Sequence, residues 1–481
     1  MLREKNVIKL FNYMIVICGV LLVFLTPPLA VPDECTHYIN AYSYSIDAMN
    51  FFPDHDETSG ETGKYLPRYI CDFANKYKDN SAGALDEGYS FSEAYFDSWL
   101  PVSDDDRINV FWKSDLVSVN FFSYIVAATG MSIGAVICRF VGGGLDTAYN
   151  LLLAGRLANL SFYIIISNIA ISTTPYLKKT MMLLLSLPMS IFLAASVSYD
   201  AILIPVSCLF FAEIIKLTQK NNAVVVEKKD TILIMICTLF LIAVKMMCAP
   251  FLLMLLCIPF KSFKTKKQYI LSICVSILTG LVAILPSVLN RYVNNIVTVD
   301  TNEAVIRQIE YIQENPLLFP QIVVNSFSKY ANFYLTGFVG KLGYQDTNFP
   351  VIYIAIVFFI LLIVTIIELC TIQNPPNKKI RIGSFLLFVL VILAIYYTMY
   401  TEWTPLVEEL HGSTVSGIQG RYFIPLCLYP LILFMNNFFL RLPEKIENRI
   451  DCQISELSKG MIVLSTMGTV LIILLRYWCI K

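Results

Sequence analysis

Two adjacent acids and a histidine follow the first long apolar run of the chain. They are Asp33, Glu34 and His37, in the segment Val31-Pro32-Asp33-Glu34-Cys35-Thr36-His37. On a helical turn, one acid and His37 would share a face. The lower dielectric of a membrane interface strengthens a carboxylate's hold on a proton or a cation. The pattern indicates a general base, or alternatively the acidic first turn of an interfacial helix. Mg²⁺ or Mn²⁺ could bind the same two carboxylates.

An arginine preceded by glycines marks a second candidate site. It is Arg421, in the segment Gly417-Ile418-Gln419-Gly420-Arg421-Tyr422-Phe423-Ile424-Pro425. A guanidinium can bind two oxygens of a phosphate, and glycines allow a ligand to approach the backbone. Arginine can instead anchor a helix by reaching the lipid headgroups. The glycines and Gln419 favour the ligand role, and we include Tyr422 in the candidate site.

Ionisable side chains inside apolar runs form a third group. They are Arg156, accompanied by Asn159, and Lys245 and Asp200. A charge inside a bilayer costs about 2.5 to 3.5 kcal/mol on insertion scales, so such residues are usually paired or functional. Arg156 and Lys245 could line a pocket for a lipid phosphate. Equally, Asp200 could pair with either of them in a structural role.

A polar loop at residues 401–421 holds the last candidates. Glu402 with Trp403, and Glu408 with Glu409, could form a sugar platform from an aromatic face and hydrogen-bond acceptors. A tryptophan at this depth also serves as a membrane anchor.

Composition shows what must surround these residues. Of 481 residues, 56% are hydrophobic and 15% are charged, whereas soluble domains have about 25% charged residues. This excludes an ordinary soluble protein. Lys+Arg and Asp+Glu both number 36, so there is no basic excess to hold nucleic acid. The 13 cysteines are scattered without a CxxC pair, which argues against a structural metal or a disulfide scaffold.

Long apolar runs predict an all-α, polytopic integral membrane protein. A helix needs about 20 apolar residues to cross the hydrocarbon. Such runs occur at 12–31, 146–171, 180–217, 230–260, 268–289, 349–370, 380–400, 422–440 and 459–478. Two of them are too long for one crossing, and each is expected to turn in its middle, at Ser198-Tyr199-Asp200 and near Lys245 and Pro250. The total is about 11 transmembrane helices.

Positive charge predicts the orientation of these helices. Eleven crossings with a cytoplasmic N-terminus place five Lys/Arg clusters inside. These clusters fall within 178–179, 216–229, 261–267, 378–381 and 441–449. Counting 118–141 as a crossing would invert every later loop, so this stretch is expected as a helix at the outer interface. Loops 32–145, 290–348 and 401–421 then lie outside, with a membrane-dipping helix at about 317–339.

Chemistry is therefore expected on the outer face. The three histidines, His37, His55 and His411, all fall in the outer loops. ATP is absent there, and the chain has no P-loop. A transfer reaction on this face needs a preactivated donor, for which a lipid carrier is the natural source.

Five motifs, in order along the chain, resemble a bacterial membrane-protein family called domain of unknown function 2142. They are Pro32-Asp33-Glu34-x-x-His37, Ala154-Gly155-Arg156-Leu157-x-Asn159, Ser196-x-Ser198-Tyr199-Asp200-Ala201, Lys245 and Gly417-Ile418-Gln419-Gly420-Arg421-Tyr422-Phe423-x-Pro425. The likeness spans nearly the whole chain. One departure is Val31, where the family usually has another proline. That family is itself similar to the GT-C glycosyltransferases, which take a sugar from a polyprenyl-phosphate carrier.

The resemblance implies a GT-C-like fold and a glycosyltransferase in the bacterial plasma membrane. Asp33 or Glu34 would be the base, and His37 would orient it or bind the acceptor. Arg421 would bind the lipid phosphate. The other residues of the predicted substrate site are Gln419, Tyr422, Lys245, Arg156, Asp200, Glu402 and Trp403. The expected partners are a polyprenyl-phosphate-linked sugar, a cell-envelope glycan or lipid acceptor, and membrane lipids.

Two other functions stay open. A transporter or flippase of lipid-linked saccharide would need a polar path, and the charged residues inside the runs are few and form no chain. A non-catalytic component of an envelope-polysaccharide assembly complex would not need the acids or Arg421.

Overall fold

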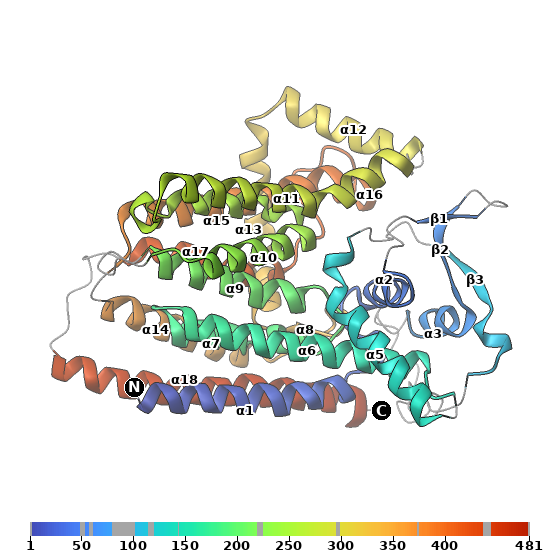
Figure 1. The fold of residues 1–481 in the computed structure, drawn as a ribbon, viewed down its shortest axis with the longest axis horizontal. Helices are drawn as coiled ribbons and strands as arrows, with labels where there is room; N and C mark the ends of the chain where they lie inside the picture. Colours follow the sequence, from blue (N-terminus) through green and yellow to red (C-terminus); the bar gives the residue numbers. More distant parts are fainter. Residues whose placement is uncertain are drawn as a thin grey trace. The chain divides into compact units, whose positions relative to one another are not determined.

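The computed structural model describes residues 2–48, 53–56, 61–78, 102–113, 120–142, 144–218, 225–294, 299–372, 375–435 and 444–479. Helices predominate in these ranges, with two small β-sheets (Figure 1). The fold is of the all-α, polytopic class that the apolar runs predict. The chain divides into two compact units. Unit 1 comprises Met1–Leu209, Gly340–Glu368 and Leu442–Lys481, and unit 2 comprises Phe210–Val339 and Leu369–Arg441.

Unit 1 is built on long helices that pack side by side. Its helices, of which α9 and α14 end in unit 2, are α1 (Leu2–Leu25), α2 (Glu34–Ile46), α3 (Arg68–Lys78), α5 (Ile125–Val141), α6 (Ala148–Thr173), α7 (Lys178–Leu185), α8 (Pro188–Ala194), α9 (Asp200–Leu217), α14 (Val351–Thr371) and α18 (Glu444–Leu474). Short helical turns are η2 (Asp105–Arg107), η3 (Phe121–Ser123) and η9 (Leu475–Cys479). α1 lies along α18 and α6, and α5 packs on α6 and α2 (Figure 1).

The predicted outer loop 32–145 contains folded structure. Strands β1 (Asp54–His55), β2 (Thr62–Pro67) and β3 (Asn109–Lys113) form an antiparallel sheet in that order. Buried aromatic residues of α2 and α3, with residues of α5 and α6, form the core beneath it. A second ribbon pairs β4 (Lys341–Leu342) with β5 (Thr347–Asn348) just before α14.

Unit 2 combines α-helices with several 3₁₀ segments and a π-helical segment, η6. Its helices are α10 (Lys228–Val244), α11 (Lys266–Asn294), α12 (Val299–Glu314), α13 (Leu318–Val339), α15 (Lys378–Thr398), α16 (Thr404–Val407) and α17 (Leu428–Leu431). The shorter turns are η4 (Met246–Cys257), η5 (Phe260–Ser262), η6 (Met399–Trp403), η7 (Gly420–Leu426) and η8 (Ile432–Phe434). α10 packs on α11, η4 packs on α15, and α13 packs on η7.

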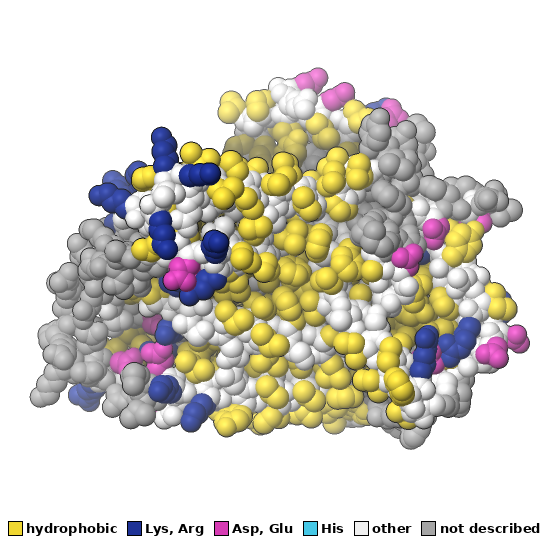
Figure 2. Space-filling model, viewed as in Figure 1, with side chains coloured by type: hydrophobic (Ala, Val, Ile, Leu, Met, Phe, Trp, Pro, Cys, Tyr) yellow, Lys and Arg dark blue, Asp and Glu magenta, His cyan; other side chains and the backbone are white. Residues whose placement is uncertain are grey.

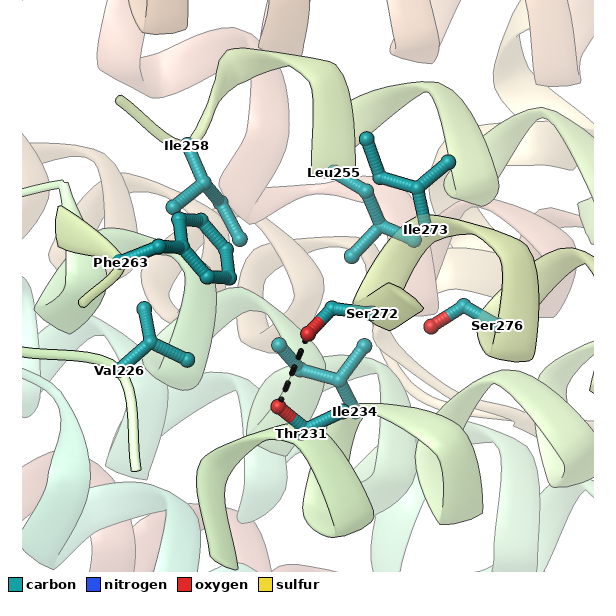
Figure 3. Close-up of a pocket in the computed structure, with 9 residues that line it drawn as sticks. All are labelled: Val226, Thr231, Ile234, Leu255, Ile258, Phe263, Ser272, Ile273 and Ser276. Atoms are coloured by element: carbon teal, nitrogen blue, oxygen red, sulfur yellow. Dashed lines mark hydrogen bonds between the residues drawn. The ribbon is translucent and has the colours of Figure 1, made fainter. Parts of the chain in front are cut away.

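The space between α10, η4 and α11 is closely packed. Figure 3 shows the residues around a gap there, among them Thr231 and Ser272, whose hydroxyl oxygens lie 3.3 Å apart. The gap has a volume of about 10 Å³, which is room for about one water molecule. This part of unit 2 is therefore core and offers no ligand site.

Six helices in the described part of the chain are long and apolar enough to cross a membrane. They are Glu4–Leu25, Ala148–Thr173, Lys266–Leu289, Val351–Thr371, Lys378–Val407 and Arg449–Cys479. The count of about eleven is thus not confirmed. α5 and η4 are apolar but shorter. On α11 the apolar side chains Ile270, Leu278 and Leu281 are about half exposed, and Figure 2 shows hydrophobic side chains widely exposed over the helices. Such surfaces suit contact with lipid.

Helix breaks within the apolar runs account for much of the difference between the predicted number of transmembrane helices and the number of long apolar helices in the structure. The run 180–217 divides into α7, α8 and α9, with a break just before Asp200. The run 230–260 breaks at Lys245, between α10 and η4. Both breaks lie where the sequence predicts turns. The run 422–440 is not a single helix as predicted, since its described part consists of η7, α17 and η8. Pro425 and Pro430 lie in this run, and proline lacks the backbone N–H that a continuous helix requires.

Candidate functional site

The end of α1 leads directly into the predicted acidic motif. Pro27 and Pro28 follow α1 by two and three residues, and proline cannot continue a helical hydrogen-bond ladder. Leu29 and Asp33 then adopt the left-handed conformation, with φ of 57° and 62°. These turns reverse the chain, so that α2 begins at Glu34. Both acids are thereby placed at the start of α2.

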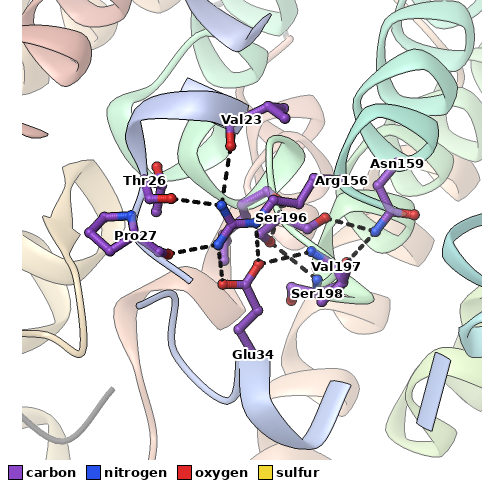
Figure 4. Close-up of polar contacts among 10 residues, drawn as sticks. Val23, Thr26, Pro27, Glu34, Arg156, Asn159, Ser196, Val197 and Ser198 are labelled. Carbon is purple, nitrogen blue, oxygen red and sulfur yellow. Dashed lines mark hydrogen bonds and ion pairs between the residues drawn. The ribbon is translucent and has the colours of Figure 1, made fainter. Parts of the chain in front are cut away.

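Arg156 of α6 is the centre of a buried cluster of hydrogen bonds (Figure 4). Its Nε donates to Glu34 Oε1 at 2.8 Å, and its Nη2 donates to Glu34 Oε2 at 2.6 Å. Nη1 donates to the carbonyl oxygens of Val23 and Thr26, and Nη2 also donates to that of Pro27. A guanidinium has five N–H donors. All five are therefore used within the protein.

The loop between α8 and α9 completes this cluster. The Val197 N–H donates to Glu34 Oε1 at 3.3 Å. The Asn159 side-chain amide, one turn along α6 from Arg156, donates to the carbonyl oxygens of Ser196 and Ser198. The cluster thus ties together the end of α1, the start of α2, α6 and the loop before α9 (Figure 4).

This geometry changes the roles expected for two residues. The side chains of Glu34 and Arg156 are both 0% exposed. A buried ion pair of this kind is strongly destabilised when one partner is removed, by about 3–5 kcal/mol. Glu34 cannot reach a substrate proton, and Arg156 has no donor left for a phosphate. We assign both to structure, which corrects their predicted roles as base and phosphate ligand.

Asp33 differs from its neighbour Glu34 in exposure. It is exposed, whereas Glu34 is buried. It occupies the N-cap position of α2, but its side chain makes no capping hydrogen bond. Left-handed backbone is uncommon outside glycine, although Asp tolerates it better than most residues. The buried cluster beneath Asp33 holds that backbone in place.

His37 faces two tyrosines one turn into α2. Its Nδ1 lies 2.9 Å from the Tyr124 hydroxyl, and its ring meets Tyr199 edge-on with centroids 4.5 Å apart. Asp200 follows Tyr199 in the first turn of α9 and is buried. Its backbone N–H donates to the Ser198 hydroxyl oxygen at 3.2 Å. Sequence reasoning missed Tyr124 and Tyr199 as partners of His37, because they come from distant parts of the chain.

A second cluster, in unit 2, brings together three predicted phosphate-site residues. The Lys245 ammonium lies 3.9 Å from the centroid of the Tyr422 ring. The Arg421 guanidinium carbon lies 5.6 Å from the same centroid. Arg421 is only 4% exposed. A phosphate that reached this ring would therefore meet two cationic side chains, one at the break after α10 and one in η7.

The glycines around Arg421 permit close packing. A Cβ atom at Gly420 would collide with the backbone of α13 at Tyr334 and Phe338. Gly417 has a φ of 83°, and a Cβ there would lie 2.5 Å from the Trp403 ring. Gln419 is the N-cap residue of η7. These glycines thus serve packing of η7 and its approach loop, a use that the sequence alone does not separate from ligand binding.

The third predicted loop, 401–421, is held by α12. The His411 N–H donates to Gln308 Oε1 at 3.0 Å, and the His411 ring stacks on Tyr311 with centroids 4.2 Å apart. Trp403 is 42% exposed and Glu402 is half-buried. The sugar platform of Trp403 with Glu402, Glu408 and Glu409 stays a prediction. The side chain of His55, the third histidine, lies outside the described residues.

A two-carboxylate metal site at Asp33 and Glu34 does not fit the geometry, because Arg156 occupies both oxygens of Glu34. In the described part of the chain, no three His, Cys, Asp or Glu side chains come together as a metal site. A further ion pair of unit 1 links Arg107 to Asp146 through two hydrogen bonds of 3.0 and 2.7 Å. The hydrogen bonds from Arg107 hold the pKa of the Asp146 carboxyl below its usual value. This pair fastens η2 to the start of α6.

Comparisons with curated proteins and with solved structures gave no match. One family does match, over residues 16–429, and it is described as predicted membrane protein (DUF2142). The matched range contains both the Glu34–Arg156 cluster and the Arg421–Tyr422–Lys245 cluster. With most of its length covered, the chain belongs to the DUF2142 family of predicted membrane proteins.

Proposed function

We propose that this protein is a membrane glycosyltransferase. It moves a sugar from a polyprenyl-phosphate carrier to a cell-envelope glycan or lipid acceptor at the outer face of a bacterial plasma membrane. Asp33 acts as the general base, and Arg421 with Lys245 binds the carrier phosphate. The observation that carries the proposal is the exposed, left-handed Asp33 held beside the buried Glu34–Arg156 pair.

The surroundings of Asp33 suit a general base. A base must be accessible to its substrate and fixed in position by its support. Asp33 is exposed and directly precedes Glu34, which is held by Arg156 and by the Val197 N–H. A left-handed residue other than glycine stores about 1 kcal/mol or more, and such strain is concentrated at functional sites. His37, one turn along the same helix and 4% exposed, is proposed to orient Asp33 or to bind the acceptor.

The reaction is a single displacement. The Asp33 carboxylate takes the proton of the acceptor hydroxyl while that oxygen forms a bond to the anomeric carbon. The bond from the anomeric carbon to the phosphate oxygen breaks, and the phosphate leaves with the electron pair as polyprenyl phosphate. Arg421 and Lys245 stabilise the charge that develops on this phosphate. The anomeric centre is inverted.

The test is transfer of labelled sugar from a panel of polyprenyl-phosphate sugars by the purified protein in nanodiscs. Asp33→Asn should reduce transfer by at least about 10²-fold, the usual range for loss of a general base. Asp47→Asn is the matched control, because Asp47 is an exposed acid at the opposite end of the same helix. It should keep wild-type transfer. Equal activity of the Asp33→Asn and wild-type proteins would remove the base assignment.

The same assay separates the alternatives. Wild-type protein that moves a lipid-linked saccharide between leaflets without consuming it would be a transporter or flippase. Protein that neither transfers nor moves the saccharide, but whose loss stops envelope-polysaccharide assembly, would be a non-catalytic component. Either result would overturn the glycosyltransferase proposal.

A further inference from the structure

Unit 1 contains an open groove of about 640 Å³ between α14 and α18. This volume is in the range of about 300–1,000 Å³ that is typical of small-molecule sites. Ile352 and Tyr353 of α14 line one wall, and Leu471 and Ile472 of α18 line the other. Polar side chains lie at one end only. The groove therefore has an apolar length and a polar mouth.

The rim of the groove is suited to contact with lipid. Both of its helices are among those long and apolar enough to cross a membrane. Ile352 is 73% exposed and Leu471 is 56% exposed, so the outer rim is apolar. Residue 468 is glycine, which allows Tyr353 to pack closely against α18, since a Cβ there would lie 2.5 Å from the Tyr353 hydroxyl. A hydrocarbon chain can enter sideways from the bilayer.

Arg476 provides the charge at the mouth. Its Nη2 lies 3.4 Å from Asp346 Oδ2, with the two side chains 35% and 23% exposed. Its Nε is buried and makes no hydrogen bond within the described residues. The first turn of α14 begins beside it, after Pro350, which also lines the groove. The N–H groups of a helix's first turn can attract anions; the Tyr353 N–H already donates to the Pro350 carbonyl, so in α14 the donors concerned are those of Val351 and Ile352. The mouth thus offers donors to a phosphate, in competition with Asp346.

The mouth belongs to the same end of unit 1 as the acidic motif. Trp478, two residues after Arg476, donates from Nε1 to the carbonyl oxygen of Leu25 at 3.0 Å. The next carbonyls, of Thr26 and Pro27, accept from Arg156. The C-terminal end of α1 therefore lies between the groove's helix and the Glu34–Arg156 cluster.

We propose that this groove binds a polyprenyl monophosphate, with the isoprenoid chain along α14 and α18 and the phosphate at Arg476. The identity of the chain as isoprenoid rests on the proposed function. A single chain fits better than a two-chain lipid, since the volume is that of one drug-sized molecule. The groove is thus a binding place for the lipid carrier, separate from the Arg421 cluster in sequence and in unit.

The test measures binding of a short-chain polyprenyl monophosphate to the purified protein in nanodiscs, by native mass spectrometry. Leu471→Trp fills the groove and should lower affinity about tenfold. Met467→Trp is the matched control, because Met467 is also 56% exposed on α18 but does not line the groove. It should change affinity less than about twofold. All variants are compared for thermal unfolding, so that a folding defect is recognised.

Two charge variants sharpen the test. Arg476→Gln should weaken binding about tenfold, because a charge-assisted hydrogen bond to phosphate is lost. Asp346→Asn should tighten binding, because a competing carboxylate is removed. Equal binding by Leu471→Trp and wild type, or weaker binding by Asp346→Asn, would overturn the inference.

Competing lipids distinguish the inference from the proposed function. Phosphatidic acid also carries a phosphate monoester but has two acyl chains, so it should compete poorly with the polyprenyl phosphate for the groove. If phosphatidic acid at the same concentration displaced the polyprenyl phosphate, the groove would be a general lipid site instead. Binding that passes these tests without any sugar transfer would defeat the proposed function and leave the groove as a polyprenyl-phosphate site. Transfer that continues in Leu471→Trp with unchanged binding would defeat the groove and leave the function.

Discussion

Arg156 in unit 1 and Arg421 in unit 2 are buried arginines with opposite surroundings. Arg156 is 0% exposed and gives all five donors to Glu34 and to three backbone carbonyls. Arg421 is 4% exposed and shares the ring of Tyr422 with a second cation, Lys245. Burial alone would rank both as functional candidates. Their neighbours separate them: Arg156 is paired with a carboxylate and gives all of its donors to the protein, whereas Arg421 lies beside a second cation on one tyrosine ring.

The comparison predicts that removing Arg156 has the largest effect, and that the effect is on stability. Arg156→Ala should lower the free energy of unfolding by about 3–5 kcal/mol, because the Glu34 carboxylate stays buried without its partner. Thermal unfolding in detergent measures this. The control is Arg139→Ala, since the Arg139 side chain is 72% exposed and its Nε lies 3.8 Å from Asp146. A fully folded but inactive Arg156→Ala protein would return Arg156 to the substrate site.

Arg421→Ala should instead affect activity. Loss of a group that stabilises transition-state charge typically costs about 10²- to 10³-fold in rate. Sugar transfer from a polyprenyl-phosphate donor is the measurement, with thermal unfolding recorded alongside. Arg421→Lys keeps the positive charge but not the planar guanidinium, so its transfer rate should lie between those of Arg421→Ala and the wild-type protein. If Arg421→Ala loses stability as Arg156→Ala does, and Arg421→Lys restores only stability, the contrast between the two arginines fails.

Lys245→Met should give a smaller loss, of about tenfold in transfer, because Arg421 remains at the ring. The matched control is Lys329→Met, since the Lys329 ammonium also lies over a tyrosine, 4.9 Å from the Tyr330 ring centroid. That control should keep wild-type transfer. The double variant of Lys245 and Arg421 should lose less than the sum of the single effects if both act on one phosphate. If the effects of the two substitutions on transfer were fully additive, Lys245 and Arg421 would not act on the same phosphate.

The smallest expected effect concerns acid stability. Arg107 lowers the folded-state pKa of Asp146. The pair therefore stabilises the folded protein at pH values above the ordinary pKa of an aspartate, and this contribution is lost as the pH falls through the lowered pKa. Because Arg107 is 34% exposed, the contribution is about 1 kcal/mol or less. Unfolding measured from about pH 6 to about pH 3 should show a shallower acid loss in Asp146→Asn than in wild type. Identical pH profiles would exclude this pair as a source of acid sensitivity.

The sequence predicts most of the helices but not how their polar residues combine. The apolar run 146–171 matches α6 closely, because apolar length directly reflects the needs of a bilayer. The stretch 317–339, predicted as a helix within a loop, matches α13. The run 422–440 fails, since its prolines break the helix while leaving its hydropathy unchanged.

For the candidate site too, the sequence predicts the residues but not their contacts. The types of Glu34 and Arg156 mark them as important, but their pairing joins positions 122 residues apart, which no local spacing reveals. Likewise the sequence names Lys245, Arg421 and Tyr422 separately, and only the fold places both cations on one ring. Residue type identifies candidates, whereas the partners that decide between structure and function come from tertiary packing.

The hydrogen bonds at the end of α1 have a consequence for biogenesis. The carbonyls of Val23, Thr26 and Pro27 accept from Arg156 of α6, and that of Leu25 accepts from Trp478. Carbonyl groups that lack a partner near hydrocarbon are costly. During synthesis α1 is made well before α18, yet its last turn gains its final partner only when residue 478 has been made. A helix made early is therefore completed late, and ribosome-bound chains that stop before α18 should show an α1 end still open to water-soluble labelling reagents.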